Sequence, residues 1–318
     1  MTKPTNDLAF TREDLYGTTP EHTFAGATSF MRRKYTRDLT GVDVAVSGVP
    51  YDLATSNRSG SRMGPRAIRN ISSTLSWGTV MGWNFDPFDK LAVIDYGDCD
   101  FYPGRPHLVP DEIHAHAKHI LDNDVAMLTL GGDHFVTYPV VKAHAEKHGP
   151  ISLIHFDAHS DTWEDEDGRI DHGTMFYHAA KQGIINPEAS AQIGMRLANP
   201  KTHGYNVFDA KWVHDNGVEA TAAKIKEMVG DNPCYLTFDI DCLDPCYAPG
   251  TGTPVCGGLS TYQALHILRG LDGINIVGMD LVEVAPAYDV GEITSLAGAT
   301  IALDLLCLYA SSKEQRQK

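Results

Sequence analysis

The stretch Ile151–Thr162, "ISLIHFDAHSDT", joins a short apolar run to a cluster of carboxylate and imidazole side chains. The run "ISLI" has the length and the apolar character of a buried strand. Asp157, His159 and Asp161 follow it at intervals of two residues, so in extended backbone their side chains point the same way. The stretch therefore predicts a buried strand whose carboxyl end presents three potential metal ligands. His155 lies inside the strand and is expected to be a packed core residue.

The rest of the chain repeats this alternation of apolar strands and helices. Strand character is found in residues 42–49, 91–95, 126–130, 151–156, 190–195, 234–238 and 275–282. Between them, residues 110–123, 140–148, 218–230 and 261–271 carry apolar side chains at helical spacing, and Pro65 suits the first turn of a further helix. Strands this uniformly apolar predict a parallel sheet that is covered by helices on both faces. We expect one domain over residues 1–318, of which residues 1–40 form an irregular arm that packs on the rest of the domain or on a neighbouring subunit.

The charge balance limits the classes of partner. The chain has 41 acidic and 26 basic side chains and a net charge of −15, so nucleic acid and anionic membrane surfaces are not expected partners, whereas a small cation is attracted. The start "MTKPTNDLAF" does not have the pattern of a secretory signal. Residues 293–310 are strongly apolar but include Asp304, which favours a buried helix over a membrane span. Six cysteines without a Cys-x-x-Cys pair suit a reducing compartment, so we expect a cytoplasmic protein.

Two other expected strands also end in metal-type ligands. The run "AMLTL" leads into "GGDH" with His134, and "CYLTF" leads into "DIDCLDP" with Asp239 and Asp241. Ligands bind beyond the carboxyl ends of the strands in open α/β sheets. Three distant segments are thus expected to bring six ligands to one edge of the sheet: His134, Asp157, His159, Asp161, Asp239 and Asp241.

Electrostatics indicates what such a cluster holds. Two carboxylates about 4 Å apart repel each other by about 4 kcal/mol at an effective dielectric constant near 20. Four carboxylates in one cleft therefore need protons or cations, and two divalent metal ions match their charge. Carboxylates and imidazoles without a thiolate favour a hard ion, with manganese as the first choice, although ligand type alone leaves other metals open. A pair of such ions can bridge one water and present hydroxide near neutral pH.

Several motifs together resemble a known family. These are "GGDH", "FDAHSD", "DHGTMF", "FDIDCLDPCYAPGTGTP" and "VEVAPAYD", within a similarity that runs from Val46 to Ala310. They resemble the ureohydrolases, the arginase–agmatinase family, and most closely its bacterial agmatinases. The resemblance implies a three-layer α/β/α fold with a mostly parallel sheet of about eight strands, two Mn²⁺ ions per subunit, and a homo-oligomer, either a trimer or a hexamer.

The resemblance also assigns roles to individual residues. The six candidate ligands fall on the family's six ligand positions. His172 in "DHGTMF" matches a proton-shuttling histidine, and Glu283 in "VEVAP" matches the glutamate that binds the substrate guanidinium. Thr253 in "TGTP" matches a residue that lines the pocket.

The implied reaction is hydrolysis of a guanidinium group. A metal-bridging hydroxide attacks the guanidinium carbon, Glu283 orients the group, and Asp161 holds the hydroxide while it also ligates metal. His172 supplies the proton that the leaving amine needs. The acidic run that includes Glu164 and Asp165 lies where ureohydrolases place a substrate-contacting loop, and it would favour an ammonium tail over a carboxylate tail. We therefore expect agmatine to be hydrolysed to putrescine and urea.

Three alternatives remain open at this stage. A related amidinohydrolase would act on guanidinobutyrate or another guanidino compound, which assays of urea release would reveal. A metal-dependent deacetylase would use one zinc and only Asp157, His159 and one further aspartate, so a count of bound metals separates it. A catalytically inactive regulator of polyamine metabolism would bind metal but hydrolyse no guanidine.

Overall fold

The structure is a computed structural model that describes residues 7–19, 21–165 and 167–316. Within these residues nine strands form one entirely parallel sheet, in the order β1-β3-β2-β4-β9-β8-β5-β6-β7. The strands are β1 (Lys34–Tyr35), β2 (Val44–Val49), β3 (Val93–Asp98), β4 (Ala126–Gly131), β5 (Ser152–Phe156), β6 (Ala191–Ile193), β7 (Asn206–Phe208), β8 (Cys234–Asp239) and β9 (Ile276–Val282). All seven predicted strands are present. The two that were not predicted, β1 and β7, are short and lie at the two edges of the sheet.

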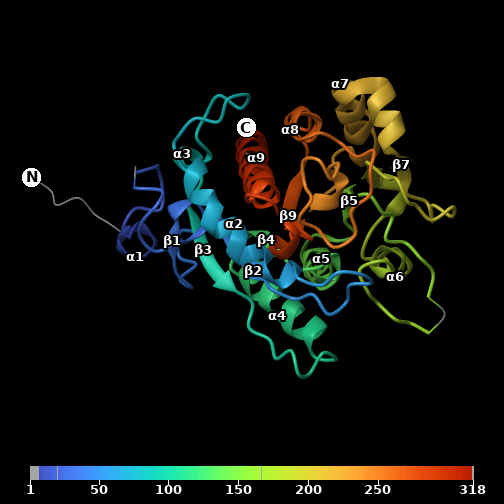
Figure 1. Ribbon diagram of the computed structural model, residues 1–318, viewed down its shortest axis with the longest axis horizontal. Coiled ribbons are helices and arrows are strands. Elements are labelled where there is room, and N and C mark those ends of the chain that lie inside the picture. The colour runs from blue at the N-terminus through green and yellow to red at the C-terminus, as the bar shows by residue number, and fades with distance from the viewer. Residues whose placement is uncertain (1–6, 20, 166, 317–318) are drawn as a thin grey trace, which may run out of the picture.

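Helices cover both faces of the sheet, as the apolar strands predicted (Figure 1). One face packs against α4 (Val109–Asp122), α5 (Thr137–His148) and α6 (Met175–Lys181). The other packs against α2 (Gly64–Ser72), α3 (Pro87–Lys90), α7 (Ala210–Val229), α8 (Thr261–Gly270) and α9 (Ile293–Arg316). The fold is therefore the expected three-layer α/β/α architecture, with nine strands in place of about eight. Single 3₁₀ turns span Phe30–Arg32, Ser61–Met63, Ser73–Leu75, His134–Val136, Pro187–Ala189, Ile240–Cys242 and Pro286–Tyr288.

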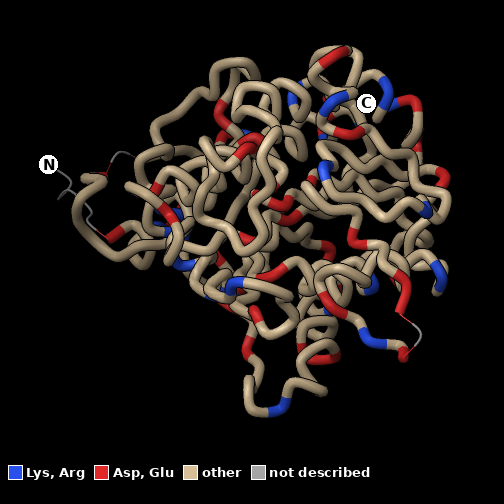
Figure 2. The backbone as a smooth tube through the Cα atoms, turned by 45° about the vertical axis from the view of Figure 1, so that its right-hand side comes forward, with Lys and Arg blue, Asp and Glu red and all other residues tan. Residues whose placement is uncertain are grey.

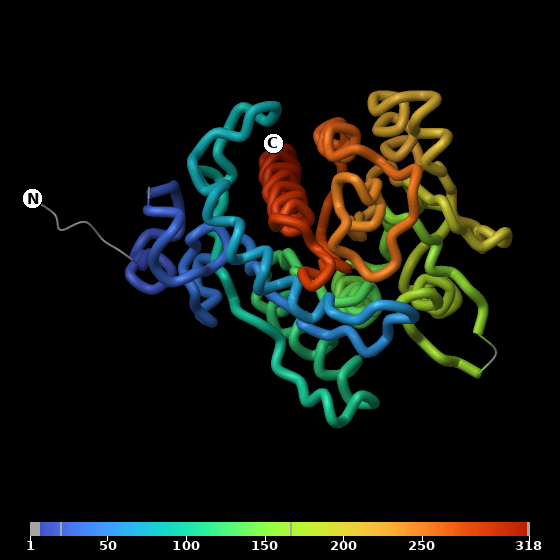
Figure 3. The backbone as a smooth tube through the Cα atoms, in the orientation of Figure 1, coloured from blue at the N-terminus to red at the C-terminus, as the bar shows by residue number. Residues whose placement is uncertain are grey.

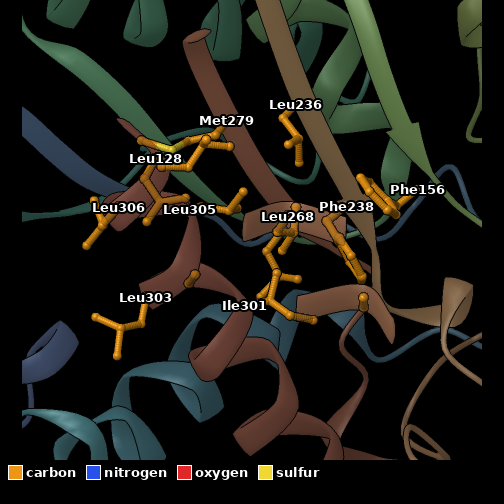
Figure 4. Close-up of a cluster of buried hydrophobic side chains, with 14 of the residues drawn as sticks. Leu128, Phe156, Leu236, Phe238, Leu268, Met279, Ile301, Leu303, Leu305 and Leu306 are labelled. Atoms are coloured by element: carbon orange, nitrogen blue, oxygen red, sulfur yellow. The ribbon is translucent and has the colours of Figure 1, made fainter. Parts of the chain in front are cut away.

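Alternation along the strands produces two cores, because successive side chains point to opposite faces. In β4, Leu128 and Leu130 join the cluster on the α9 side, while Met127 joins the cluster on the α4–α5 side. Figure 4 shows the first cluster, where Leu128 and Met279 of the sheet lie close to Leu305 and Leu306 of α9.

Helix α9 is the buried helix that the sequence predicted. Its 24 residues include a window with a mean hydropathy of 1.7, apolar enough to cross a membrane, but 78% of that window is buried inside the protein. Asp304 in this helix is fully buried and accepts hydrogen bonds from Arg269 Nε at 2.8 Å and Trp83 Nε1 at 2.7 Å. These two donors satisfy the carboxylate that made a membrane span unfavourable.

The amino-terminal arm packs on its own chain. It contains α1 (Leu8–Thr11), and its end forms β1, which extends the sheet beside β3 (Figure 3, blue). Phe30 and Met31 are fully buried in the core on the α9 side. The guanidinium of Arg33 is also buried; burial lowers its pKa to about 9, and it donates to the carbonyl of Gly17 at 2.9 Å. A contact of the arm with a neighbouring subunit stays a prediction.

Helix α7 begins eight residues earlier than the periodicity indicated, at Ala210 rather than Val218. Asp209 caps it by accepting from the backbone N–H of Trp212 at 2.6 Å. The helix kinks at Gly217, whose φ of 85° lies in the left-handed region. The kink interrupts the apolar spacing, and the first two turns were missed for that reason.

The strand order decides where the site forms. Strands β4, β9, β8 and β5 are consecutive neighbours in the sheet, although they lie far apart in the sequence. Because they are parallel, their carboxyl ends meet along one edge.

Candidate active site

The four neighbouring strands each deliver predicted site residues from their carboxyl ends. The 3₁₀ turn after β4 carries His134, and the segment after β5 carries Asp157, His159 and Asp161. Strand β8 ends at Asp239 and is followed by a 3₁₀ turn with Asp241, and Glu283 follows β9. The structure brings all six candidate ligands together.

The first half of the cluster is centred on the imidazole of His134. Its Nδ1 lies 2.9 Å from Asp157 Oδ2, 3.1 Å from Asp161 Oδ2 and 3.2 Å from Asp239 Oδ2. This nitrogen is buried, yet it has no hydrogen-bond partner with suitable geometry among the described residues. A buried nitrogen without a hydrogen-bond partner, next to three carboxylate oxygens, is suited to bind a cation together with them.

The second half is centred on His159. Its Nδ1 lies 3.3 Å from Asp157 Oδ1 and 3.2 Å from Asp241 Oδ2. Asp157 thus turns one carboxylate oxygen toward each imidazole. The potential ligands form two groups, each close enough to hold an ion, and Asp157 belongs to both. One group is His134, His155, Asp157 and Asp161, and the other is Asp157, His159 and Asp241. The arrangement fits two cation positions joined by one bridging carboxylate.

Two residues behind His134 fix its tautomer. His134 Nε2 lies 2.8 Å from Thr237 Oγ1, and the Thr237 hydroxyl donates to Asp280 Oδ1 at 2.6 Å. The hydroxyl must then accept from Nε2–H, which leaves a lone pair on Nδ1 for a cation. Asp280 is fully buried and also accepts from Thr137 and Tyr235. Sequence reasoning missed Thr237 and Asp280, although polar side chains inside "LTF" and "GMDLV" were a signal.

His155 is fully buried, as expected, but it does more than pack. Gln192 Nε2 donates to its Nδ1 at 3.2 Å, so its Nε2–H donates to Asp157 Oδ2 at 2.7 Å. Burial would raise the pKa of Asp157, but the nearby imidazoles of His155, His134 and His159 lower it well below its ordinary value. The polar character of residue 155 within an apolar strand was the signal for this role.

The remaining carboxylates show why the cluster needs positive charge. Burial, followed by the negative charges of Asp241 and Asp157, raises the pKa of Asp239 well above its ordinary value. Burial and Asp157 likewise raise the pKa of Asp161. For His134, burial lowers the pKa, but the nearby carboxylates of Asp157, Asp161 and Asp239 outweigh it and hold the pKa well above the usual range. Without metal, protons gather where cations would bind. Figure 2 shows that acidic segments also lie in the centre of the molecule.

His172 and Glu283 form a pair beside the cluster. His172 Nε2 accepts from the backbone N–H of Ser56 at 2.9 Å, and Nδ1 lies 3.1 Å from Glu283 Oε1. Burial lowers the pKa of His172, but the Glu283 carboxylate raises it further, to about 9. Glu283 Oε1 also accepts from the backbone N–H of His134 at 2.9 Å. This carboxylate therefore connects the predicted proton shuttle to the metal cluster.

The backbone is strained at two of these residues. Asp161 has a φ of 51° and Glu283 a φ of 64°, in the left-handed region that costs a residue with a Cβ about 1–2 kcal/mol. Glu283 is held there by its N–H, which donates to the carbonyl of Gly132 at 2.8 Å. Strain of this kind at strand ends redirects a side chain away from the path of its strand.

A cavity of about 260 Å³ opens onto the cluster. Among the described residues its lining includes His159, Asp161, His172, Asp239 and Thr253 from the predicted set, together with Ser56, Trp163, Arg169, Asp171, Gly173 and Thr174. His134, Asp157, Asp241 and Glu283 lie behind this lining and are almost fully buried. Thr253 donates to Asp241 Oδ2 at 3.1 Å, which links the pocket wall to the ligand set. Direct contact of Glu283 with a substrate stays a prediction.

The predicted acidic run is arranged differently from a simple substrate-facing loop. Glu164 binds Lys201 Nζ at 2.8 Å and is absent from the described lining of the cavity. Asp165 Oδ2 lies 3.3 Å from Arg169 Nε, and it is Arg169 that reaches the cavity. Substrate contact by Glu164 and Asp165 stays a prediction. Asp171, which the sequence reasoning did not single out, does line the cavity.

Comparison with known proteins identifies the family of the chain. The arginase family model matches residues 42–307. An agmatinase of Chromobacterium violaceum is 58% identical over 309 residues, which are 96% of each chain. The crystal structure of a hypothetical agmatinase from Burkholderia thailandensis has a TM-score of 0.95 at 58% identity and covers 97% of this chain and 99% of that chain. The proclavaminate amidino hydrolase of Streptomyces clavuligerus has a TM-score of 0.85 at 39% identity, covering 92% of this chain and 100% of that chain. The chain therefore belongs to the arginase family.

Proposed function

We propose that this protein hydrolyses agmatine to putrescine and urea and that it does so with two Mn²⁺ ions per subunit. The observation that carries the proposal is the divided role of Asp157, whose two oxygens face the imidazoles of His134 and His159. The agmatinase of Chromobacterium violaceum, with 58% identity over nearly the full chain, supports agmatine as the substrate.

The ligand set suits hard divalent cations. Asp157 would bridge the pair, with His134, Asp161 and Asp239 on one side and His159 and Asp241 on the other. Such a pair supplies charge neutralisation and lowers the pKa of a water molecule toward neutrality. Manganese is our proposal on the basis of the oxygen-rich ligand set and the resemblance to the family.

The chain's own residues bind and orient the substrate. The carboxylate of Glu283 would pair with the guanidinium by charge-assisted hydrogen bonds after the substrate displaces its contact with His172. Asp161 lines the cavity next to the ligand cluster and would accept a hydrogen bond from the attacking water. These contacts would hold the guanidinium carbon in the path of the nucleophile.

His172 would deliver the proton to the leaving amine. It lines the cavity, and because Nε2 accepts from the Ser56 N–H, its transferable proton is on Nδ1, 3.1 Å from Glu283 Oε1, where it would become available once the substrate takes over the Glu283 contact. Its Nε2 is positioned by Ser56, which contributes both its backbone N–H and its hydroxyl. A positioned and protonated imidazole is suited to general acid catalysis.

The alternative is a related amidinohydrolase with a carboxylate-tailed substrate such as guanidinobutyrate. The net charge of −15 favours the dicationic agmatine over a substrate with a carboxylate tail. The two activities share the reacting group, so only the tail distinguishes them.

The test is urea release after manganese loading, from equal concentrations of agmatine, arginine and 4-guanidinobutyrate. We expect the highest kcat/KM with agmatine and two metals per chain by elemental analysis. Asp157→Asn, with nearly the same volume, should reduce both the metal content and the rate. Turnover of agmatine no faster than that of guanidinobutyrate would overturn the substrate, and a single zinc per chain would favour the deacetylase.

The protein is also proposed to be a cytoplasmic homo-oligomer, a trimer or a hexamer. The resemblance to the family supports this. Light scattering on the eluting protein measures the subunit number, and a monomer across the micromolar range would contradict it.

A further inference from the structure

An ion-pair group formed by Asp165, Arg169 and Asp171 reaches the cavity through Arg169 and Asp171. Arg169 Nε lies 3.3 Å from Asp165 Oδ2 and 3.0 Å from Asp171 Oδ2. Arg169 and Asp171 both line the cavity, and Asp171 directly precedes His172 in the chain. The tail of a substrate whose guanidinium lies at His172 would share the cavity with Arg169 and Asp171.

The guanidinium of Arg169 lies between the carboxylates of Asp165 and Asp171. Two aspartates and one arginine leave a net charge of −1, so the group is not neutralised by its own arginine. The Asp165 side chain is only 10% exposed, and its Oδ2 accepts no hydrogen bond from the described residues despite the nearby guanidinium. A buried acceptor without a donor is costly, and a donor with better geometry would satisfy it.

The guanidinium of Arg169 can leave the two carboxylates at a small cost in free energy. Its side chain is 70% exposed, so the guanidinium can turn into water with little desolvation cost and little lost packing. Its backbone carbonyl stays in place, because it accepts from Thr174 Oγ1 at 3.0 Å and His178 Nε2 at 3.1 Å. The carboxylates, in contrast, are fixed by their own turns, since Asp171 Oδ1 accepts from Gly173 N and Asp165 Oδ1 accepts from Asp167 N.

We propose that Asp171, assisted by Asp165, binds the tail ammonium of the substrate in place of Arg169, and that Arg169 sets the selectivity by competing for these carboxylates. Asp171 and Arg169 then act in opposite directions: the carboxylate favours an ammonium tail, and the released guanidinium would favour a carboxylate tail. The inference rests on the proposed function, because it concerns the tail of a guanidino substrate.

Glu164 provides the contrast. It belongs to the same acidic segment but is paired with Lys201 at 2.8 Å and lies 3.8 Å from His203 Nε2, outside the described lining of the cavity. If the net acidity of the segment selected the substrate, Glu164 would matter as much as Asp171. If direct contact with Asp171 selects the substrate, Glu164 would matter clearly less than Asp171.

The experiment compares three variants, Asp171→Asn, Arg169→Gln and, for comparison, Glu164→Gln. Each variant is loaded with manganese and assayed with three substrates. These are agmatine with an ammonium tail, 4-guanidinobutyrate with a carboxylate tail, and butylguanidine with an uncharged tail. Asparagine retains the Oδ1 acceptor of the turn with Gly173, so Asp171→Asn removes charge while preserving the turn. Arg169→Gln leaves the two hydrogen bonds to its carbonyl intact.

We expect Asp171→Asn to lower kcat/KM for agmatine about tenfold, mainly through KM, since a charge-assisted hydrogen bond at a partly exposed site is lost. With butylguanidine its kcat should stay within about twofold of the wild type, which excludes damage to His172. Arg169→Gln should raise kcat/KM for agmatine about threefold and lower it for guanidinobutyrate by a similar factor. Glu164→Gln should change the ratio of agmatine to butylguanidine activity clearly less than Asp171→Asn does.

Two results would overturn the inference. One is an unchanged ratio of agmatine to butylguanidine activity in Asp171→Asn. The other is an equal loss of selectivity in Glu164→Gln, which would assign selection to diffuse charge. Both leave the proposed function intact, whereas failure of the wild type to hydrolyse any of the three guanidines would reject the function itself.

Discussion

The substitution Thr237→Val tests how the protein prepares His134 for metal. It replaces a hydroxyl by a methyl group of similar size in strand β8, where residue 237 is fully buried. The change removes the acceptor of His134 Nε2–H, now at 2.8 Å, and the donor to Asp280 Oδ1, now at 2.6 Å. The ring proton would then move to Nδ1, where three carboxylates accept it, and Nδ1 would no longer ligate metal.

The expected size follows from these contacts. A buried donor or acceptor that loses its partner costs about 1–3 kcal/mol, and loss of a supporting contact to a metal-ligating histidine typically lowers affinity 10–100-fold. That factor corresponds to about 1.4–2.7 kcal/mol. Asp280 keeps its hydrogen bonds from Thr137 and Tyr235, so the fold should survive. Only the ion beside His134 should weaken, because His159 and Asp241 have no contact with Thr237 among the described hydrogen bonds.

The assay is urea release as a function of free Mn²⁺, together with equilibrium dialysis. The valine variant should bind one ion with wild-type affinity and the other 10–100-fold more weakly, and its activity should recover at high Mn²⁺. Thr237→Ser retains the hydroxyl and should behave like the wild type. Two ions bound to the valine variant with unchanged affinity would refute the reasoning on the tautomer.

Three further outcomes are expected. Removal of metal with a chelator should abolish urea release and lower Tm, because bound ions stabilise the fold by mass action and shield the carboxylates. Addition of Mn²⁺ should restore both activity and Tm. An unchanged Tm after chelation would count against the metal cluster. Glu283→Gln should lower kcat/KM about 100-fold with normal Mn²⁺ content, because it removes the charge that pairs with the guanidinium; loss of metal instead would reassign the residue. In metal-free protein the folded pKa of His172, about 9, exceeds the unfolded value near 6.5, so its stabilising contribution is full below pH 6.5 and is lost as pH rises through 9. Denaturant unfolding should show that loss in the wild type and a flatter profile in His172→Asn.

Much of the fold and the ligand set follows from local sequence. The apolar run of β5 and the two-residue spacing after it predict Asp157, His159 and Asp161 as ligands, and the structure brings them into one cluster, although the φ of 51° at Asp161 departs from the expected extended backbone. The same reasoning identifies His134 and Asp241 at the ends of other strands. It succeeds because both the period of a strand and the charge cost of clustered carboxylates depend on neighbouring residues alone.

Other features required the tertiary structure. The position of β9 between β4 and β8 brings Glu283 to the cluster, and no local pattern specifies that neighbour. The supporting contacts of His134 through Thr237 and Asp280 join strands β8 and β9 across the sheet, so neither residue shows its role in its own segment. The sequence by itself therefore determined which side chains are candidates for the chemistry, because spacing and charge are local. Only the packing of distant strands and loops decided that Asp171 lines the cavity and that Nδ1 of His134 faces the carboxylate cluster. Hydrogen-bond partners depend on which segments are neighbours in the folded protein.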